Sequence, residues 1–285
     1  MRRWLAPTPD GPITGDVAVP GSKSATARGY VLAALSDGPS VLSGVLDARD
    51  TRLMRAGLTS LGVRFAECGT GRVMVTPPEE FTAGEIDCGL AGTLMRFVPP
   101  IAALAVGPSR FHGDPEASAR PVQPLLEGLG QLGVRVQHPS SLPFTIHGTG
   151  TVRGGTATID ASASSQFVSG LLLAGARFGD GLQLTHAGSR VPSPPHIALT
   201  LAMLADRGVV TSADEHRTAW RVEPGPIAAR DEAIEPDLIN AATFLAAPLV
   251  TGGSVGLAWP AHTAQAADTI LATLEALGGR IDRTP

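Results

Sequence analysis

The sequence predicts an α/β (α+β) fold made of repeated units, and three observations support this prediction. An apolar segment followed by a glycine and a short strand recurs roughly every 70 residues. An amphipathic helix closed by a glycine and followed by another strand recurs at a similar interval. The length of 285 residues suffices for one large or two ordinary domains. Each unit is therefore expected to run strand, helix, strand, helix and one or two further strands.

The first pattern occurs four times and predicts a helix, a turn and a strand in each copy. The copies are Tyr30 to Leu42, Val98 to Phe111, Ser169 to Leu184 and Ala242 to Leu257, with turns at Gly38, Gly107, Gly181 and Gly253. These glycines are 69, 74 and 72 residues apart. Regular spacing of this kind indicates a repeated structural unit rather than a chance resemblance between segments.

The second pattern also occurs four times, with Leu, Ala or Met at three- and four-residue spacing. The copies are Leu53 to Phe65, Leu125 to Val136, Ile197 to Val210 and Asp268 to Ile281, with Gly62, Gly133, Gly208 and Gly278. Each glycine stands where the end of a helix needs a left-handed residue. We therefore expect a helix, a left-handed glycine and a strand in each copy.

The four units predict a complete domain of three units and part of a second domain. Three units can close around a shared helical core, whereas a fourth has no neighbour to cover its apolar face. We expect the three-unit domain at residues 18–228, and the partial domain at residues 1–17 and 229–285. Because no capping element follows the fourth unit's second helix, we expect a C-terminally truncated molecule.

Composition and charge exclude several classes of function. A net charge of −4 and a pI near 6.0 provide no basic face for nucleic acid. Cys68 and Cys88 form no CxxC, and the seven histidines form no HxxxH or HExxH, so no metal, other cofactor or disulfide is expected. Apolar runs such as Phe97 to Val106 are too short to span a membrane, and the start lacks a signal peptide. We expect a cytoplasmic protein with small ligands.

Lys23 is the chain's one lysine among 22 cationic residues, and it lies in a turn of small residues before an apolar helix. Unpaired backbone N–H groups at such a helix start, with Lys23 and Arg28 five residues apart, favour binding of phosphate or carboxylate. Ser24 lies between them. The alternative is a surface turn with a solvated lysine.

Two further segments bring glycine and arginine to expected helix starts. Gly92 lets a ligand approach the backbone closely, the Thr93 hydroxyl can donate to it, and Arg96 lies one turn along. Arg120 stands just before Pro121 in a loop. The alternatives are an ordinary helix start for the first segment and a solvated loop charge for the second.

Two polar segments complete the candidate site. Ser164, Ser165 and Gln166 supply more polar groups than one helix cap can use, so they suit a polyhydroxylated, anionic ligand, although capping is the commoner use of serine. Ser193 and His196 come from another unit, and a histidine at this place is more often a helix-start residue than a catalyst.

These segments together resemble the 5-enolpyruvylshikimate-3-phosphate synthases (3-phosphoshikimate 1-carboxyvinyltransferases), most closely an actinobacterial type. The family's P-G-S-K-S-x-x-N-R, A-G-T-x-x-R, G-D-x-x-x-x-x-R-P and S-S-Q-F motifs match residues 20–28, 91–96, 113–121 and 164–167. The resemblance covers essentially the whole chain. It implies six enolpyruvyl transferase-like repeats in two domains joined by two crossing strands, of which this chain holds four.

The resemblance also implies an activity: transfer of the carboxyvinyl group of phosphoenolpyruvate to the 5-hydroxyl of shikimate 3-phosphate, with release of phosphate, in aromatic amino acid biosynthesis. The resemblance further implies that shikimate 3-phosphate is bound by Ser24, Arg28, Ser164, Ser165, Gln166 and Ser193. It implies that phosphoenolpyruvate is bound by Gly92, Arg120 and Gln166. Lys23 is implied to bridge both substrates as the catalytic residue, with support from Thr93, Arg96 and His196. The clustered cations agree, because two phosphates and two carboxylates need them.

Three departures from the family pattern matter. Ala27 and Leu90 replace two asparagines, and His196 replaces a tyrosine. The resemblance places the family's proton-transferring Asp, Glu and Lys, and two later arginines, beyond Pro285, so we expect this chain alone to be inactive. A related enzyme acting on UDP-N-acetylglucosamine is disfavoured, because no cysteine occurs at residues 112–120. The alternatives are a non-catalytic fragment that binds shikimate 3-phosphate, or one half of a split enzyme completed by a second polypeptide.

Overall fold

The computed structural model describes residues 5, 8–261 and 263–283. Its helices are α1 (Lys23–Leu35), α2 (Arg49–Ser60), α3 (Gly92–Phe97), α4 (Pro99–Ala102), the 3-10 helix η1 (Pro115–Ala119), α5 (Gln123–Gln131), α6 (Ser165–Gly175), α7 (Pro194–Ala205), α8 (Leu238–Thr251) and α9 (Ala267–Ala276). Its strands are β1 (Thr14–Val17), β2 (Ser40–Ser43), β3 (Arg64–Glu67), β4 (Arg72–Thr76), β5 (Glu85–Asp87), β6 (Val106–His112), β7 (Arg135–Gln137), β8 (Phe144–Thr149), β9 (Gly155–Ile159), β10 (Leu182–His186), β11 (Thr211–Ala213), β12 (Ala219–Val222), β13 (Glu232–Ala233) and β14 (Ser254–Leu257).

The chain folds as two compact units. Unit 1 comprises Met1–Ser22 and Glu235–Pro285, and unit 2 is the continuous segment Lys23–Ile234. The limits expected from the sequence, 18 and 228, lie a few residues before these boundaries. The difference at the second boundary arises because β13 pairs with β2, so residues up to Ile234 belong to unit 2.

Unit 2 contains three four-stranded sheets with the same strand order, namely β13-β2-β4-β3, β5-β6-β8-β7 and β9-β10-β12-β11. In each sheet the first pair is parallel and the two following pairs are antiparallel. A helix lies in the sequence between the strands of the parallel pair in the second and third sheets, as a crossover requires. The mixed α/β fold of strand and helix repeats predicted from the sequence is confirmed.

The leading strands of the first and fourth repeats have changed places, a pairing that the spacing of the repeats does not specify, although the resemblance implies two strands that cross between the domains. The first sheet takes its parallel edge strand, β13, from the segment that follows the third repeat. In unit 1, β1 from the start of the chain pairs in parallel with β14 of the fourth repeat. Where the chain passes between units, Gly21 and Pro236 form an antiparallel bridge, and Ser22 N donates to Glu235 O at 2.8 Å.

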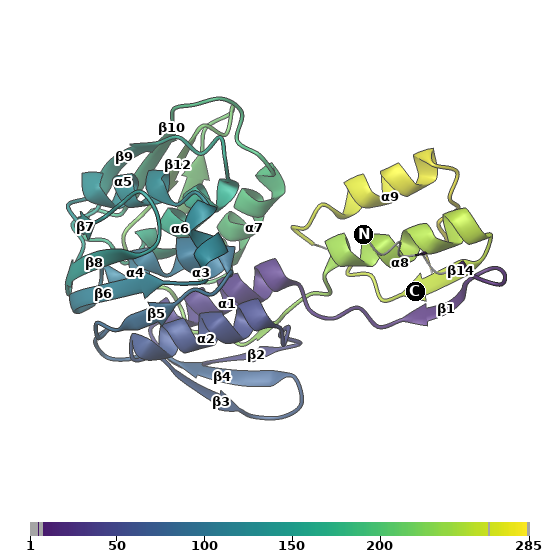
Figure 1. Cartoon of the computed structure of the whole chain (residues 1–285), viewed down its shortest axis with the longest axis horizontal. Helices are drawn as coiled ribbons and strands as arrows, with labels where there is room; N and C mark the ends of the chain where they lie inside the picture. Colours follow the sequence, from purple (N-terminus) through teal and green to yellow (C-terminus); the bar gives the residue numbers. More distant parts are fainter. Residues whose placement is uncertain (1–4, 6–7, 262, 284–285) are drawn as a thin grey trace. The chain divides into compact units, whose positions relative to one another are not determined.

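The core of unit 2 is formed by the first helix of each repeat. α1, α3 and α6 contact one another, and α1 is buried from Ala25 to Leu35 (Figure 1). α3 is buried throughout, and α6 is buried except at Gln166. The second helices α2 and α5 bury one face only, as their amphipathic sequences predict. Three repeats therefore enclose a shared helical core, with the sheets outside it (Figure 1).

The four helix-closing glycines behave as predicted. Gly62, Gly133, Gly208 and Gly278 have φ of 96°, 88°, 76° and 94°. Such left-handed backbone is costly for residues with a Cβ, which explains why glycine recurs there.

Two expectations about the repeats are wrong in detail. Gly107 lies inside β6, whereas the turn that precedes this strand falls at residues 103–105. The closing strand expected near Ile281 is absent from the described residues, where 279–283 form no regular element. The equivalent strands β3, β7 and β11 each pair with a following strand, and no described strand offers this pairing to the fourth repeat.

No helix in the described part of the chain has the length and apolar character that a bilayer crossing needs.

Candidate functional site

The predicted site residues lie on or next to helices of unit 2, most of them near the helix starts. Lys23, Ser24 and Arg28 occupy the first turns of α1, and Gly92, Thr93 and Arg96 belong to the short helix α3. Arg120 follows η1, Ser164 to Gln166 begin α6, and Ser193 and His196 begin α7. The fold thus gathers segments separated by up to 170 residues around the N-terminal ends of packed helices, where backbone N–H groups favour anions.

Arg28 is the centre of a buried hydrogen-bond network that joins three helices. Its Nε donates to Thr200 Oγ1 at 2.7 Å, and its Nη2 donates to Ser169 Oγ at 3.2 Å and to His196 O at 3.0 Å. Its Nη1 donates to Ser24 O at 3.0 Å, and Thr200 Oγ1 donates to Ser169 Oγ at 2.9 Å. Arg28 therefore ties α1 to α6 and α7.

The charge of Arg28 has no anionic partner within the protein as described. The residue is 1% exposed, and its guanidinium lies 5.1 Å from the centre of the Phe97 ring. All its described hydrogen-bond acceptors are neutral oxygen atoms. Burial lowers the pKa of Arg28 to about 9, since loss of water disfavours the charged form. An anion bound nearby would therefore stabilise the positive charge of Arg28.

Arg96 and Arg120 form a second cationic cluster beside α3. Arg96 donates Nη1 to Gln166 Oε1 at 2.7 Å, and Nε and Nη2 to Pro121 O at 3.2 and 2.9 Å. Arg120 Nη1 donates to Leu90 O at 2.5 Å. Burial, and to a smaller extent the charge of Arg120, lowers the pKa of Arg96 to about 10. Neither guanidinium forms an ion pair with a described carboxylate.

Gly92 is the point where both guanidinium groups meet the backbone. A Cβ at this position would lie 3.0 Å from Arg120 Nη1 and 3.1 Å from Arg96 Nη1. Its φ is not left-handed, so the requirement for glycine here concerns space rather than backbone conformation. The sequence-based view of Gly92 as a site of close approach agrees with this geometry, with the arginine side chains as the approaching groups.

Lys23 has a carboxylate partner that the sequence analysis did not identify. Its Nζ lies 3.3 Å from Asp50 Oδ2 on α2, and the Lys23 side chain is 50% exposed. An ion pair of this exposure is weak and can exchange Asp50 for another anion at little cost. Lys23 is thus the accessible cation of the α1 start, in contrast to Arg28.

The serine segment both caps a helix and contributes to the arginine cluster. Ser164 Oγ accepts a hydrogen bond from Gln166 N at 3.2 Å, so capping accounts for one of the three polar residues. Gln166 binds Arg96 through its carbonyl oxygen, which leaves its amide N–H groups as donors. Ser165 and Thr93 are buried. Ser193 is exposed and left-handed, with φ of 50°.

Three residues that complete these networks were missed from the sequence, namely Asp50, Ser169 and Thr200. Ser169 and Thr200 are fully buried within apolar stretches of α6 and α7. A hydroxyl in such a stretch indicates a polar partner in the core, so the sequence does carry a signal for these two residues.

Two positions where the sequence departs from the family motifs can be placed in the structure. Ala27, which replaces an asparagine, is buried. Leu90 contributes its backbone carbonyl to Arg120, a role that does not depend on its side chain.

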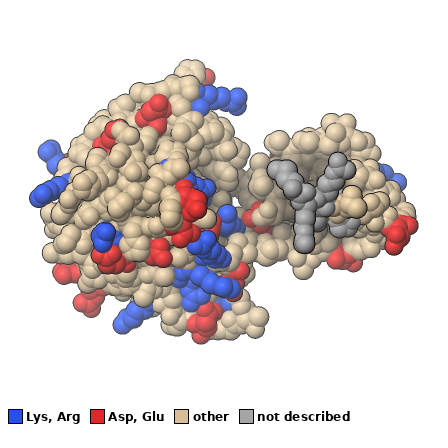
Figure 2. Space-filling view, viewed as in Figure 1, with Lys and Arg blue, Asp and Glu red and all other residues tan. Residues whose placement is uncertain are grey.

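The described residues contain no group of three or more His, Cys, Asp or Glu side chains arranged to hold a metal ion. Acidic and basic side chains alternate over the face of the molecule shown in Figure 2, in line with the net charge of −4. Arg28 on α1, Arg96 on α3 and Arg120 after η1 are among the cations that form no ion pair with a described carboxylate. This arrangement suits a small, multiply charged anion.

Three four-stranded sheets around a shared core of buried helices define a protein of repeated mixed α/β units. A family model described as EPSP synthase (3-phosphoshikimate 1-carboxyvinyltransferase) matches residues 7–285, and the chain belongs to this family.

Solved structures show the same fold. A structure of EPSP synthase from Acinetobacter baumannii has 23% sequence identity and a TM-score of 0.78, and the match covers 95% of this chain and 60% of that one. A second structure of EPSP synthase from the same organism has 23% identity and a TM-score of 0.70, and the match covers 85% of this chain and 56% of that one. The chain thus spans about 60% of the length of the solved proteins it matches.

Proposed function

We propose that this protein takes part in transfer of the carboxyvinyl group of phosphoenolpyruvate to the 5-hydroxyl of shikimate 3-phosphate. The hydroxyl oxygen adds to the central carbon of phosphoenolpyruvate, and loss of phosphate from the tetrahedral intermediate gives 5-enolpyruvylshikimate 3-phosphate. The observation that carries the proposal is the set of cations on α1, on α3 and after η1, of which Arg28, Arg96 and Arg120 have no described carboxylate partner.

The two clusters support different parts of this proposal. Lys23, Ser24 and Ser164 to Gln166, with Ser193, would bind shikimate 3-phosphate, and the exposed Lys23 would contact both substrates. Arg28, at 1% exposure, would act on this ligand through its charge and by holding α1, α6 and α7 together. Gly92, Arg120 and Gln166 would bind phosphoenolpyruvate, with Arg96 fixing the Gln166 amide at 2.7 Å and Thr93 and His196 in support.

We further propose that this chain binds shikimate 3-phosphate through unit 2 but does not complete the reaction alone. The family's acid and base residues have no assigned counterpart among the 285 residues. Loss of one general acid or base lowers the rate by roughly 10²- to 10⁴-fold. The proposal has two related forms: a binding fragment, or half of an enzyme completed in the cytoplasm by a second polypeptide.

Isothermal titration of the full chain with shikimate 3-phosphate tests the binding step. Wild type should bind, and Lys23→Ala should bind at least about tenfold more weakly, because a hydrogen bond to a charged group is lost. Arg64→Ala, which removes an exposed arginine from β3, is the matched control and should bind as wild type does. Equal affinities for all three proteins would contradict the assignment of the site.

Phosphate release on addition of phosphoenolpyruvate tests the second step. The proposal expects no release by the chain alone, and turnover by the purified chain would exclude the binding-fragment form. Restoration of turnover by a co-purifying polypeptide would favour the split enzyme.

A further inference from the structure

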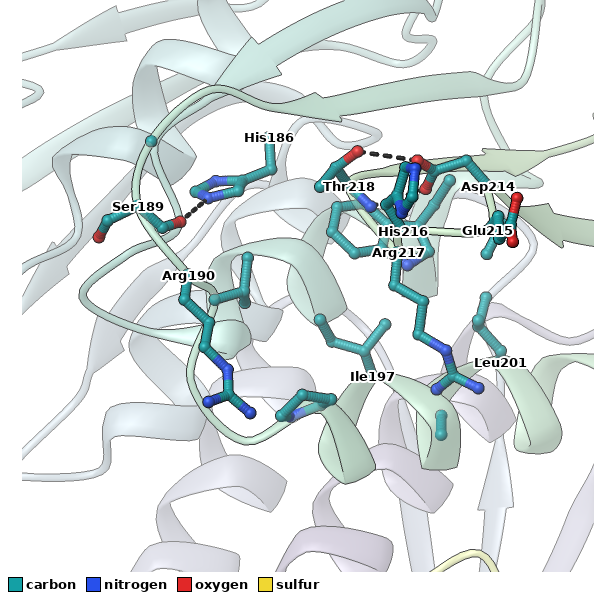
Figure 3. A pocket seen from close by; sticks show the side chains of 16 residues that line it. His186, Ser189, Arg190, Ile197, Leu201, Asp214, Glu215, His216, Arg217 and Thr218 are labelled. Atoms are coloured by element: carbon teal, nitrogen blue, oxygen red, sulfur yellow. Dashed lines mark hydrogen bonds between the residues drawn. The ribbon is translucent and has the colours of Figure 1, made fainter.

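A cavity of about 840 Å³ lies in unit 2 beside α7, outside both cationic clusters. Its walls are the segment 186–191 after β10, the outer side of α7, and the loop between β11 and β12 (Figure 3). None of the residues assigned above to the two substrates lines it. Its volume falls within the range of about 300–1,000 Å³ that is usual for small-molecule sites.

The side of the cavity formed by α7 and the sheet is apolar. Val191, Ile197, Leu201 and Trp220 line it, together with Pro194. Trp220 is 2% exposed and lies on β12, so the rigid sheet fixes its ring. An apolar wall of this kind favours a ligand with a ring or another apolar body.

Two arginines supply positive charge to the same cavity. Arg190 and Arg217 are exposed, and neither forms an ion pair with any described carboxylate. In Figure 3 both guanidinium groups extend from the loops towards α7, on either side of Ile197. Guanidinium groups can bind the carboxylate of a ligand while an apolar wall contacts the rest of it, so the cavity suits a carboxylate with an apolar body.

Two carboxylates, those of Asp214 and Glu215, also line the cavity. Asp214 accepts hydrogen bonds from Ala219 N at 2.7 Å, Thr218 N at 2.6 Å and Thr218 Oγ1 at 2.8 Å. These bonds, that from Ala219 foremost, lower the pKa of Asp214 and engage its carboxylate within the hairpin. Glu215 lies on the hairpin with Asp214, to one side of Arg217 in Figure 3.

The loops around the cavity are held in place, as a preformed site requires. His186 Nδ1 accepts from Ala161 N at 3.1 Å, so its Nε2 carries the proton and donates to Ser189 O. This pair fixes the segment that leads to Arg190. Asp214 fixes the opposite loop through its three hydrogen bonds.

We propose that this cavity binds a small carboxylate with an apolar ring body, with Arg190 and Arg217 on the carboxylate and Trp220, Ile197 and Leu201 against the ring. Val191 and Pro194 flank Ser193 in the sequence and line the cavity. A bound ligand would therefore contact the segment that carries Ser193 without occupying the cationic clusters.

The test uses the full chain with 2-naphthylacetate as the probe, followed by the NMR signal of the Trp220 indole N–H. Trp220→Phe assigns this signal among the three tryptophans. The expected result is a saturable shift of the Trp220 signal, with affinity about tenfold weaker in Arg190→Gln and in Arg217→Gln. Arg135→Gln, an exposed arginine on β7, is the matched control and should leave the affinity unchanged.

Two comparison probes test the two parts of the ligand. 2-Naphthaleneethanol, which lacks the charge, and acetate, which lacks the ring, should both bind at least about tenfold more weakly. Equal binding of the neutral probe, an unmoved Trp220 signal, or equal weakening by Arg135→Gln would overturn the proposal.

Lys23→Ala separates this proposal from the proposed function. It should leave 2-naphthylacetate binding unchanged while it weakens shikimate 3-phosphate binding. Loss of 2-naphthylacetate binding in Lys23→Ala would place the probe in the substrate cluster and overturn the second site. Absence of shikimate 3-phosphate binding, with the Trp220 shift intact, would count against the proposed function alone.

Discussion

Arg28 and Arg120 are both cations without a described carboxylate partner, yet their surroundings differ. Arg28 is 1% exposed and makes four hydrogen bonds to oxygen atoms of α1, α6 and α7. Arg120 is exposed, follows the 3-10 helix η1, and makes one described hydrogen bond, to Leu90 O. The resemblance assigns both to substrate binding, and the structure shows that only Arg120 has a guanidinium exposed to solvent.

The difference shows how one residue type serves structure and recognition. A buried guanidinium whose N–H groups are already used holds helices together and contributes charge at a distance. An exposed guanidinium with free N–H groups can meet a ligand directly. Arg96 lies between the two cases, because it is buried but contacts Gln166 at the cluster. Four substitutions test this division.

Arg28→Ala should have the largest effect, on stability. The change leaves the hydroxyls of Thr200 and Ser169 and two carbonyls without their donor in the core, and it opens a cavity. We expect the free energy of unfolding to fall by about 3 kcal/mol or more, measured by denaturant titration. Arg28→Met, which keeps much of the stem volume, separates lost hydrogen bonds from lost packing. Arg64→Ala should change stability by less than about 0.5 kcal/mol. If Arg28→Ala changed the free energy of unfolding only slightly, the structural role assigned to Arg28 would be wrong.

Arg120→Ala should affect ligand affinity and spare stability. Phosphoenolpyruvate affinity, titrated with shikimate 3-phosphate present, should fall by about tenfold, because a charged hydrogen bond is lost. The free energy of unfolding should change by less than about 0.5 kcal/mol. A large loss of stability with unchanged affinity would reverse the contrast with Arg28.

Thr200→Val should weaken the Arg28 network at one point. The Thr200 hydroxyl accepts from Arg28, and its single proton has two acceptors within reach, Ser169 Oγ at 2.9 Å and His196 O at 3.0 Å. Its loss should cost about 1 kcal/mol of unfolding free energy. Because Ser169 shares the network, the double variant with Ser169→Ala should deviate from the sum of the single changes. Strict additivity would show that the two hydroxyls act independently.

Gly92→Ala should have the smallest effect. The new Cβ would come within 3.0 and 3.1 Å of the Arg120 and Arg96 guanidinium groups, whose flexible side chains can move by a few tenths of an ångström. We expect roughly threefold weaker phosphoenolpyruvate binding in the same titration, since each misplaced charged contact is weakened. Thermal unfolding should be nearly unchanged, and Gly130→Ala, at an open position on α5, is the control for adding a methyl group to a glycine.

The repeats could be predicted because their signals are local. Apolar spacing located the helices, and glycines such as Gly62 and Gly208 marked their left-handed ends. The motifs also located the residues at the starts of α1, α3, α6 and α7. These features depend on neighbours within a few turns of chain, which a sequence shows directly.

The remaining features depend on contacts between distant segments. The exchange of β1 and β13 involves pairing across about 190 residues for β13 and β2, for which two short strands carry no visible signal. The ion pair of Lys23 with Asp50 joins two helices of one repeat, and the bonds of Arg28 with Ser169 and Thr200 join separate repeats. The exposure that distinguishes Arg28 from Arg120 follows from packing, which the motif does not specify.

The antiparallel bridge between Gly21 and Pro236 has a consequence for the covalent layout of the molecule. Ser22 and Glu235, joined by a backbone hydrogen bond of 2.8 Å, immediately flank the continuous segment 23–234. Unit 2 is thus an insert in the sequence of unit 1, which acts as the host chain, and the two connections between them are neighbours. A short linker in place of residues 23–234 should rejoin the host chain with little loop-closure cost. Unit 2 itself has adjacent ends, the arrangement that circular permutation and insertion into another protein require.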